Sequence, residues 1–215
     1  MGNRNTTSFQ SLKDLPTPLS QSQCVLHKHE LLICGGYEQR ACYSYHTIKN
    51  EYKFICEYPS DAQLRGYCVV KLVDNNNKDK NQITLLSNKF DNYNQWISFT
   101  DNDNHSIIIG RDNDNYIDVR ALIGGSNNHL LFITYLKNKI SVFNLNTFQF
   151  IKHDHLPFYM NYLPFHCFVP NSENGQEQVQ EMIKTNKQHY QMLLFCKSTG
   201  LLIAYDEDNN DFQFH

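Results

Sequence analysis

The chain has 215 residues, of which 40% are hydrophobic and 19% charged, so it is large and apolar enough to form one ordinary globular domain or at most two small ones. Its formal net charge of -3 excludes the basic surplus expected of a dedicated nucleic-acid-binding protein. No apolar run approaches the roughly 18 residues of a membrane-spanning helix, so we expect no stable membrane insertion.

Residues 1–8 are predicted to form a flexible tail that carries a lipidation pattern. Met1 to Thr6 fit the sequence M-G-x-x-x-[ST], which predicts myristoylation of Gly2 after removal of Met1. One acyl chain supports only weak, reversible membrane association. Residues 1–20 contain no apolar segment of the kind found in a secretory signal peptide, so we expect a cytoplasmic location.

The chain has seven cysteines, an odd number that does not suit a closed set of disulfides. Most of them lie in apolar runs, as Cys34 and Cys196 do. They are therefore interpreted as small, reduced core residues.

The first predicted repeat unit covers residues 22–59. It begins with two short apolar runs, the second of which ends at the pair Gly35 and Gly36. This glycine pair is interpreted as structural, because glycine permits a close approach of neighbouring backbone. Tyr45 and Tyr52 follow, seven residues apart across a polar turn. This spacing predicts a β-hairpin whose two rings face each other and fix the strand register.

Residues 66–100 form the least regular unit. The runs 68–72 and 83–86 predict two strands, but Trp96 has no aromatic residue seven positions before it. We therefore expect this unit to have lost its third strand.

Two later units repeat the aromatic spacing of the first. They are residues 117–157, with Phe143 and Phe150, and residues 164–215, with Tyr205 and Phe212. Each pair flanks a turn rich in Asn, Asp or Thr, residue types that favour tight turns. The fourth strand of the last unit is expected to be barely formed.

Successive four-stranded units at intervals of about 50 residues predict an all-β propeller with about four blades. Four is the smallest number of blades in known propellers, and the unit 66–100 is expected to lack its third strand, so we expect the ring to be incomplete. The segment 9–16 could be a closing strand that completes the last blade. Alternatively, the chain is a truncated product with an exposed sheet edge.

The first unit resembles the kelch repeat. In that family a Gly-Gly pair closes the second strand, as Gly35 and Gly36 do here, and two aromatic residues seven apart flank the turn after the third. This sequence has Tyr52, Phe150 and Phe212 where the family usually has tryptophan. The resemblance covers most of residues 9–215. It implies a kelch-like β-propeller that binds a protein partner through its loops.

No motif predicts a metal, a cofactor or a catalytic group. The candidates considered were His27 with His29, His153 with His155, Asp112 with Asp114, and Asp206 with Asp208. The histidine pairs lack further ligands, and the aspartate pairs lack the glycine that a calcium loop needs at its sixth position. The aspartates are therefore interpreted as residues of polar hairpin turns.

We expect a non-catalytic protein–protein interaction module. The polar connections 74–81, 101–115 and 171–187 are the candidate binding loops. Two alternatives stay open: an enzyme that uses the central cleft of a galactose-oxidase-like propeller, and a truncated fragment without activity. No sequence motif for a nucleophile supports the enzyme.

Overall fold

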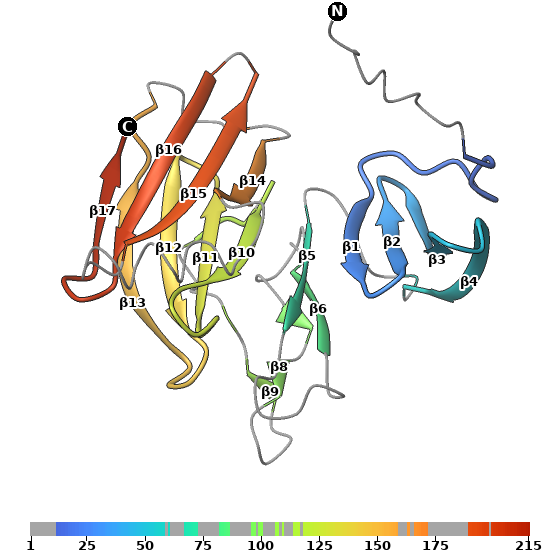
Figure 1. The fold of residues 1–215 in the computed structure, drawn as a ribbon, viewed down its shortest axis with the longest axis horizontal. Helices are drawn as coiled ribbons and strands as arrows, with labels where there is room; N and C mark the ends of the chain where they lie inside the picture. The colour runs from blue at the N-terminus through green and yellow to red at the C-terminus, as the bar shows by residue number, and fades with distance from the viewer. Residues whose placement is uncertain are drawn as a thin grey trace, which may run out of the picture.

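Every regular element in the described part of the chain is a β-strand (Figure 1). The computed structural model describes residues 12–58, 60, 67–72, 82–86, 96–97, 99–100, 106–107, 109, 114–116, 118–158, 163, 166–171, 189–197 and 199–215. Over these residues the predicted all-β class is confirmed.

The strands form antiparallel sheets in which each strand pairs with the next one along the chain. The first sheet contains β1 (Gln23–His27), β2 (Glu30–Gly36), β3 (Gln39–His46) and β4 (Glu51–Glu57). A shorter sheet of β5 (Cys68–Leu72), β6 (Gln82–Leu86) and β7 (Trp96–Ile97) follows, and then a hairpin of β8 (Phe99–Thr100) and β9 (Ser106–Ile107).

Two further four-stranded sheets complete the fold. One contains β10 (Arg120–Gly124), β11 (Leu130–Tyr135), β12 (Lys139–Asn144) and β13 (Gln149–His155). The other contains β14 (Cys167–Pro170), β15 (His189–Cys196), β16 (Thr199–Asp206) and β17 (Asp211–Phe214).

The sheets follow one another through their first strands. Strand β1 contacts β5, β5 contacts β10, and β10 contacts β14, as expected for the inner strands of successive propeller blades. The first and last sheets lie apart in Figure 1, with β5 and β6 between them. The described sheets thus form an open arc, consistent with an incomplete propeller-like fold.

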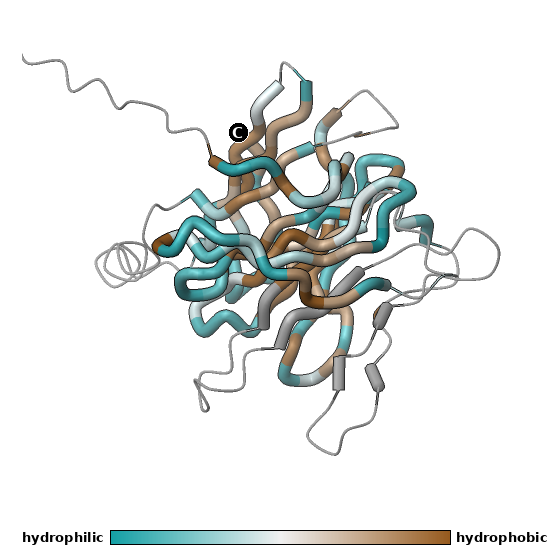
Figure 2. The backbone as a smooth tube through the Cα atoms, turned by 90° about the vertical axis from the view of Figure 1, so that its right-hand side faces the viewer, coloured by the Kyte–Doolittle hydropathy of each residue, from teal (hydrophilic) through white to brown (hydrophobic). Residues whose placement is uncertain are grey.

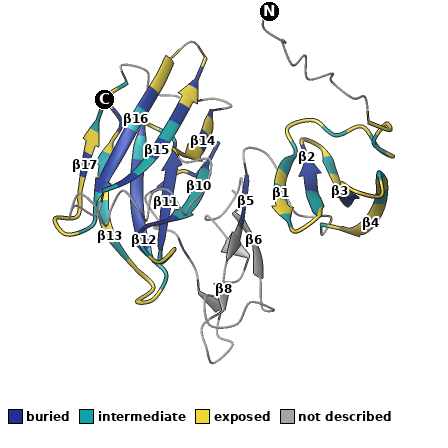
Figure 3. Cartoon of the chain, in the orientation of Figure 1, coloured by how far each residue is buried: buried dark blue, intermediate teal, exposed yellow. Residues whose placement is uncertain are grey.

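The core lies between the middle strands of the sheets. All six residues of β11 are buried, whereas β13 and β4 are largely exposed on the outer edges (Figure 3). Hydrophobic stretches gather in the middle of the molecule, and hydrophilic stretches lie mostly towards the outside (Figure 2). The largest cluster joins the last two sheets, from Phe132 to Tyr190 and Tyr205, and a second joins β5 to β10, β11 and β12.

The aromatic residues of the three four-stranded sheets occupy equivalent cross-strand positions. Tyr45 is directly opposite Tyr52, with the ring centroids 4.9 Å apart. The corresponding pairs are Phe143 with Phe150, at 5.1 Å, and Tyr205 with Phe212, at 4.9 Å. Each pair lies beside a four-residue turn, so the ring contact and the turn together fix the hairpin register.

The same three turns share a residue with a left-handed backbone. Asn50 has φ 54° and accepts a hydrogen bond at Oδ1 from the Tyr45 hydroxyl, and Asn210, with φ 52°, does the same for Tyr205. Phe148 occupies this position in the remaining turn, with φ 56°. A bulky residue is strained there, because its Cβ crowds the backbone, whereas asparagine tolerates the conformation.

Replacing Phe148 with asparagine is expected to stabilise the protein by about 0.5–1 kcal/mol, because the left-handed strain is relieved. The urea midpoint of unfolding should rise. The control is Asn210→Ala, which removes the hydrogen bond from Tyr205 and is expected to lower the midpoint. A midpoint that falls in both variants would show that packing by the Phe148 ring outweighs the strain.

The structure corrects three expectations about the strands. The unit 66–100 keeps a third strand, since β7 pairs with β6, and β17 pairs with β16 along four residues as a proper fourth strand. Residues 12–16, the described part of the predicted closing strand 9–16, form no strand. They lie instead against the first sheet, where the Tyr52 hydroxyl donates to the carbonyl of Lys13.

The cysteines are less uniformly buried than their apolar surroundings indicated. Cys34, Cys42, Cys68 and Cys196 are buried, but Cys24, Cys56 and Cys167 are exposed. For Cys24 and Cys167 the strand alternation explains the exposure, because neighbouring residues of a strand point to opposite faces of the sheet. Cys56 is exposed because it lies on the outer strand β4, which is exposed along most of its length.

Candidate functional site

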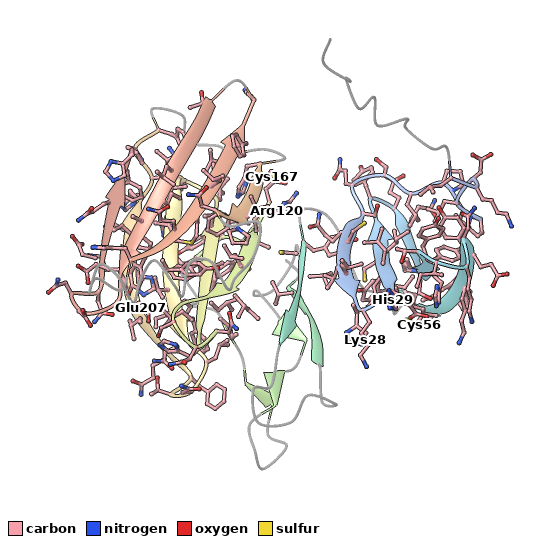
Figure 4. All side chains as sticks on the ribbon, in the orientation of Figure 1. Lys28, His29, Cys56, Arg120, Cys167 and Glu207 are labelled. Atoms are coloured by element: carbon pink, nitrogen blue, oxygen red, sulfur yellow. The ribbon has the colours of Figure 1, made fainter. Side chains whose placement is uncertain are left out.

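A polar pocket of about 460 Å³ opens between the last two four-stranded sheets. It is lined by Ser126, Asn127, His129, Leu130, Asn144, Ile151, Glu207 and Asn210. These residues come from the β10–β11 turn, from β11 to β13 and from the β16–β17 turn. Figure 4 labels Glu207 beside these turns.

Glu207 is the acidic residue of this pocket, and its carboxylate is held by the opposite sheet. The backbone N–H of Ser126 donates to Oε1 at 2.7 Å, and the Ser126 hydroxyl donates to Oε2 at 3.1 Å. His129 Nε2 lies 3.9 Å from Oε2. Only 8% of the glutamate side chain is exposed, so the carboxylate has a fixed position in the wall of the pocket.

Gly125 makes room for this carboxylate. Its φ of +84° is left-handed, and a Cβ there would lie 3.3 Å from Glu207 Oε1 and 3.0 Å from Leu130. The pair Gly124 and Gly125 therefore shapes the contact between the two sheets.

The electrostatic effect of Glu207 extends to two buried tyrosines. Burial is the main cause that raises the pKa of Tyr190 and of Tyr205 to about 12, and the nearby charge of Glu207 is the second cause.

The pocket is equipped to bind a hydrogen-bond donor. A carboxylate oxygen can accept more than one hydrogen bond, so Glu207 keeps acceptor capacity beyond its bonds to Ser126. The Ser126 hydroxyl donates to the carboxylate, which is not the arrangement of a serine activated by a histidine base. Leu130 and Ile151 provide an apolar wall for the stem of a long side chain.

A second polar cluster is buried and belongs to the core. Asp114 accepts from Lys139 at 2.6 Å and from the Tyr135 hydroxyl at 3.3 Å. The hydroxyls of Tyr135 and Ser141 are 2.8 Å apart, and Ser141 Oγ lies 2.8 Å from His153 Nδ1. Because Ser141 is completely buried, it cannot meet a substrate. The interpretation of Asp114 as a residue of a polar hairpin turn is wrong, since its side chain is buried beside Lys139.

The other aspartate pattern is a hairpin turn, as predicted. Asp206 Oδ1 accepts the backbone N–H groups of Asp208 and Asn209, both at 3.0 Å. Among the described residues, no three His, Cys, Asp or Glu side chains are grouped so that they could hold a metal ion. No helix in the described part of the chain is long and apolar enough to cross a membrane.

The residues singled out in the sequence lie mostly away from the pocket. Gly35 has a left-handed φ of 46°, and a Cβ on Gly36 would lie 2.6 Å from the carbonyl oxygen of Ser20. The local backbone therefore accounts for glycine at both positions. The aromatic pairs lie within their sheets. Gly2, and nearly all of the loops 74–81, 101–115 and 171–187, are outside the described residues.

Sequence reasoning missed the pocket because its two halves are far apart in the chain. Ser126 and Glu207 are 81 positions apart and meet only through the packing of two sheets. The available signals were indirect: a polar turn after Gly125, and an acidic turn after Tyr205.

The fold and the pocket define a propeller-like all-β protein with a polar pocket between neighbouring sheets. No known protein family matches the chain, and no curated protein does. Among solved structures, that of YjhT is similar over 94% of this chain, with 10% sequence identity and a TM-score of 0.28. The chain spans 53% of that protein's length. Values this low do not show a shared family or function.

Proposed function

We propose that this chain is a kelch-like, non-catalytic protein-interaction module whose pocket receives a lysine or arginine side chain of a protein partner. The observation that carries the proposal is the position of Glu207. Its carboxylate is fixed in the wall of the pocket, and none of the described residues that line the pocket is a lysine or arginine. A cationic donor would therefore gain a charge-assisted hydrogen bond there.

The surroundings of Glu207 favour a long cationic side chain over a small cation. Ile151 and Leu130 would contact its methylene groups. The side-chain oxygens of Asn144 and Asn210 already accept hydrogen bonds within their own turns, so Glu207 is the acceptor for the cation. Phe148, in the adjoining β12–β13 turn, and Ile151 are both partly exposed. Exposed apolar side chains beside a charged pocket are typical of a protein contact surface.

A cytoplasmic location and myristoylation of Gly2 belong to the same proposal and rest on the sequence alone. The kelch relationship is supported by the Gly35–Gly36 pair, by the aromatic pairs and by the succession of antiparallel sheets. The proposed binding function is favoured by the architecture, because binding residues often lie on loops and turns that a rigid β-scaffold holds in place.

The test is titration of the full chain with two short peptides that differ only at their central residue. One peptide has arginine there, and the other has citrulline, which has a similar shape but no charge. Binding is followed by NMR at the amides of Ser126, His129 and Asn210. We expect the arginine peptide alone to bind, and Glu207→Gln to weaken it about ten-fold or more, because the charge-assisted bond is lost.

The matched control is Asp208→Asn, which removes the same charge from an exposed position of the same turn. It should change the affinity for the arginine peptide less than about two-fold, as expected for a screened surface charge. Equal binding of both peptides, or equal effects of both variants, would contradict the assigned pocket. Chemical conversion of either peptide would contradict a non-catalytic function.

A further inference from the structure

The first sheet carries one cysteine on each of its four strands, and three of them are in register. Cys34 in β2 is directly opposite Cys42 in β3, and Cys42 is directly opposite Cys56 in β4. Directly opposite residues of antiparallel strands project to the same face, so the three thiols form a row across the sheet. Figure 4 labels Cys56 on this sheet.

A bulge in β4 produces this alignment. Tyr45 pairs with Tyr52 and Tyr43 with Phe54, so continued regular pairing would place Ile55 opposite Cys42. The register shifts between Tyr43 and Cys42, and the extra residue brings Cys56 opposite Cys42 instead. A second irregularity, between Cys34 and Gly36, lies on the other side of Cys42.

The row runs from the core to the surface. Cys34 and Cys42 are buried, whereas Cys56 is exposed on the outer strand. Opposite residues of an antiparallel pair have their Cα atoms about 4.5–5.5 Å apart, which is within the range that a disulfide spans. Cys42 and Cys56 are therefore placed to form a bond whose outer sulfur small molecules can reach.

The hydrogen bonds of the row favour ionisation at its centre. The Cys34 thiol, the Gly35 N–H and the Tyr58 hydroxyl hold the pKa of Cys42 below its ordinary value, against the effect of burial. The hydrogen bond to Cys42 and burial raise the pKa of Cys34, and burial raises the pKa of Cys56. A lowered pKa favours the thiolate of Cys42, and the thiolate is the attacking form in disulfide exchange.

We propose that Cys42 and Cys56 form a reversible thiol–disulfide site that is oxidised by a low-molecular-weight disulfide such as glutathione disulfide. The exposed Cys56 thiol loses its proton to solvent, and the resulting thiolate attacks one sulfur of glutathione disulfide. The S–S bond of glutathione disulfide breaks, a mixed disulfide forms at Cys56, and the released glutathione thiolate is protonated by solvent. The Cys42 thiolate, having lost its proton to solvent, then attacks the Cys56 sulfur. The second glutathione leaves as a thiolate and is protonated by solvent. Two thiols are oxidised, and one glutathione disulfide is reduced to two glutathiones.

The test uses the untagged full chain in buffers of varied glutathione and glutathione disulfide ratio, followed by blocking of free thiols and peptide mass mapping. The expected product is a Cys42–Cys56 disulfide that dithiothreitol reverses. Cys42→Ser should stop at glutathione on Cys56, because no attacking thiolate remains. Cys56→Ser, at an exposed position, should form no disulfide on this sheet.

Cys167→Ser is the matched control, since Cys167 is exposed but lies on another sheet, and this variant should oxidise like the wild type. A wild-type chain that stops at glutathionylated Cys56 would overturn the proposal, as would a disulfide between Cys34 and Cys42. The wild type and Cys56→Ser decide the matter even if the buried Cys42→Ser variant does not fold.

Discussion

Gly124→Ala is expected to destabilise the protein by about 3 kcal/mol, because the added methyl group overpacks the contact between two sheets. A Cβ at this position would lie 2.2 Å from the Tyr190 ring, far inside van der Waals contact. The ring is buried in the core and is stacked on Phe132, with the ring centroids 5.4 Å apart. The new methyl group must therefore separate β10 from β15 or displace Tyr190 from the core.

The measurement is the urea midpoint and slope of unfolding for Gly124→Ala beside Gly200→Ala. Gly200 is also a strand glycine, but a Cβ there meets only the side chain of Phe195, at 3.1 Å, and Phe195 is half exposed. Gly200→Ala should thus change stability by less than about 1 kcal/mol. Equal losses in the two variants would mean that glycine at position 124 is not required by the Tyr190 ring.

The free energy of unfolding is expected to fall as the pH is lowered from about 6.5 to about 4, because of His166. Burial lowers the pKa of this histidine from 6.5 to about 4, against the hydrogen bond from Nδ1 to the carbonyl of Leu163. Thr134 Oγ lies 2.6 Å from the other ring nitrogen. Between these pH values the unfolded chain binds a proton that the folded chain does not, so folding is opposed.

The stability that depends on neutral His166 is fully present above pH 6.5 and is lost by about pH 4. The difference between the two pKa values corresponds to about 3 kcal/mol. Urea unfolding across this range should show the fall, and His166→Gln should flatten it. His155→Gln, at an exposed position of β13, should keep the slope of the wild type. An unchanged slope in His166→Gln would assign the pH dependence to other groups.

The strands could be predicted because their signals are local. The run 68–72 coincides with β5, and the spacing of Tyr45 and Tyr52 matches their cross-strand pairing. An apolar run beside a tight polar turn carries enough information to fix a hairpin without knowledge of the rest of the chain. The short strand β7 was missed because its two residues lack this signal.

The contacts between sheets, and departures from regular pairing, could not be predicted. The partnership of Asp114 with Lys139 and that of Ser126 with Glu207 depend on how distant strands pack. The alignment of Cys42 with Cys56 depends on one extra residue in β4. No distinctive residue type marks this bulge, so the sequence alone would place Ile55, and not Cys56, opposite Cys42.

Each sheet is assembled from strands that follow one another in the chain, and this has a consequence for how the protein folds. Hairpins with four-residue turns, such as those beside Asn50 and Asn210, close short loops and therefore lose little chain entropy before their contacts form. Pairing within such a hairpin does not wait for distant segments, and local contacts of this kind favour fast folding. Individual sheets can form first, and the packing of β1, β5, β10 and β14 is then the late, slow step.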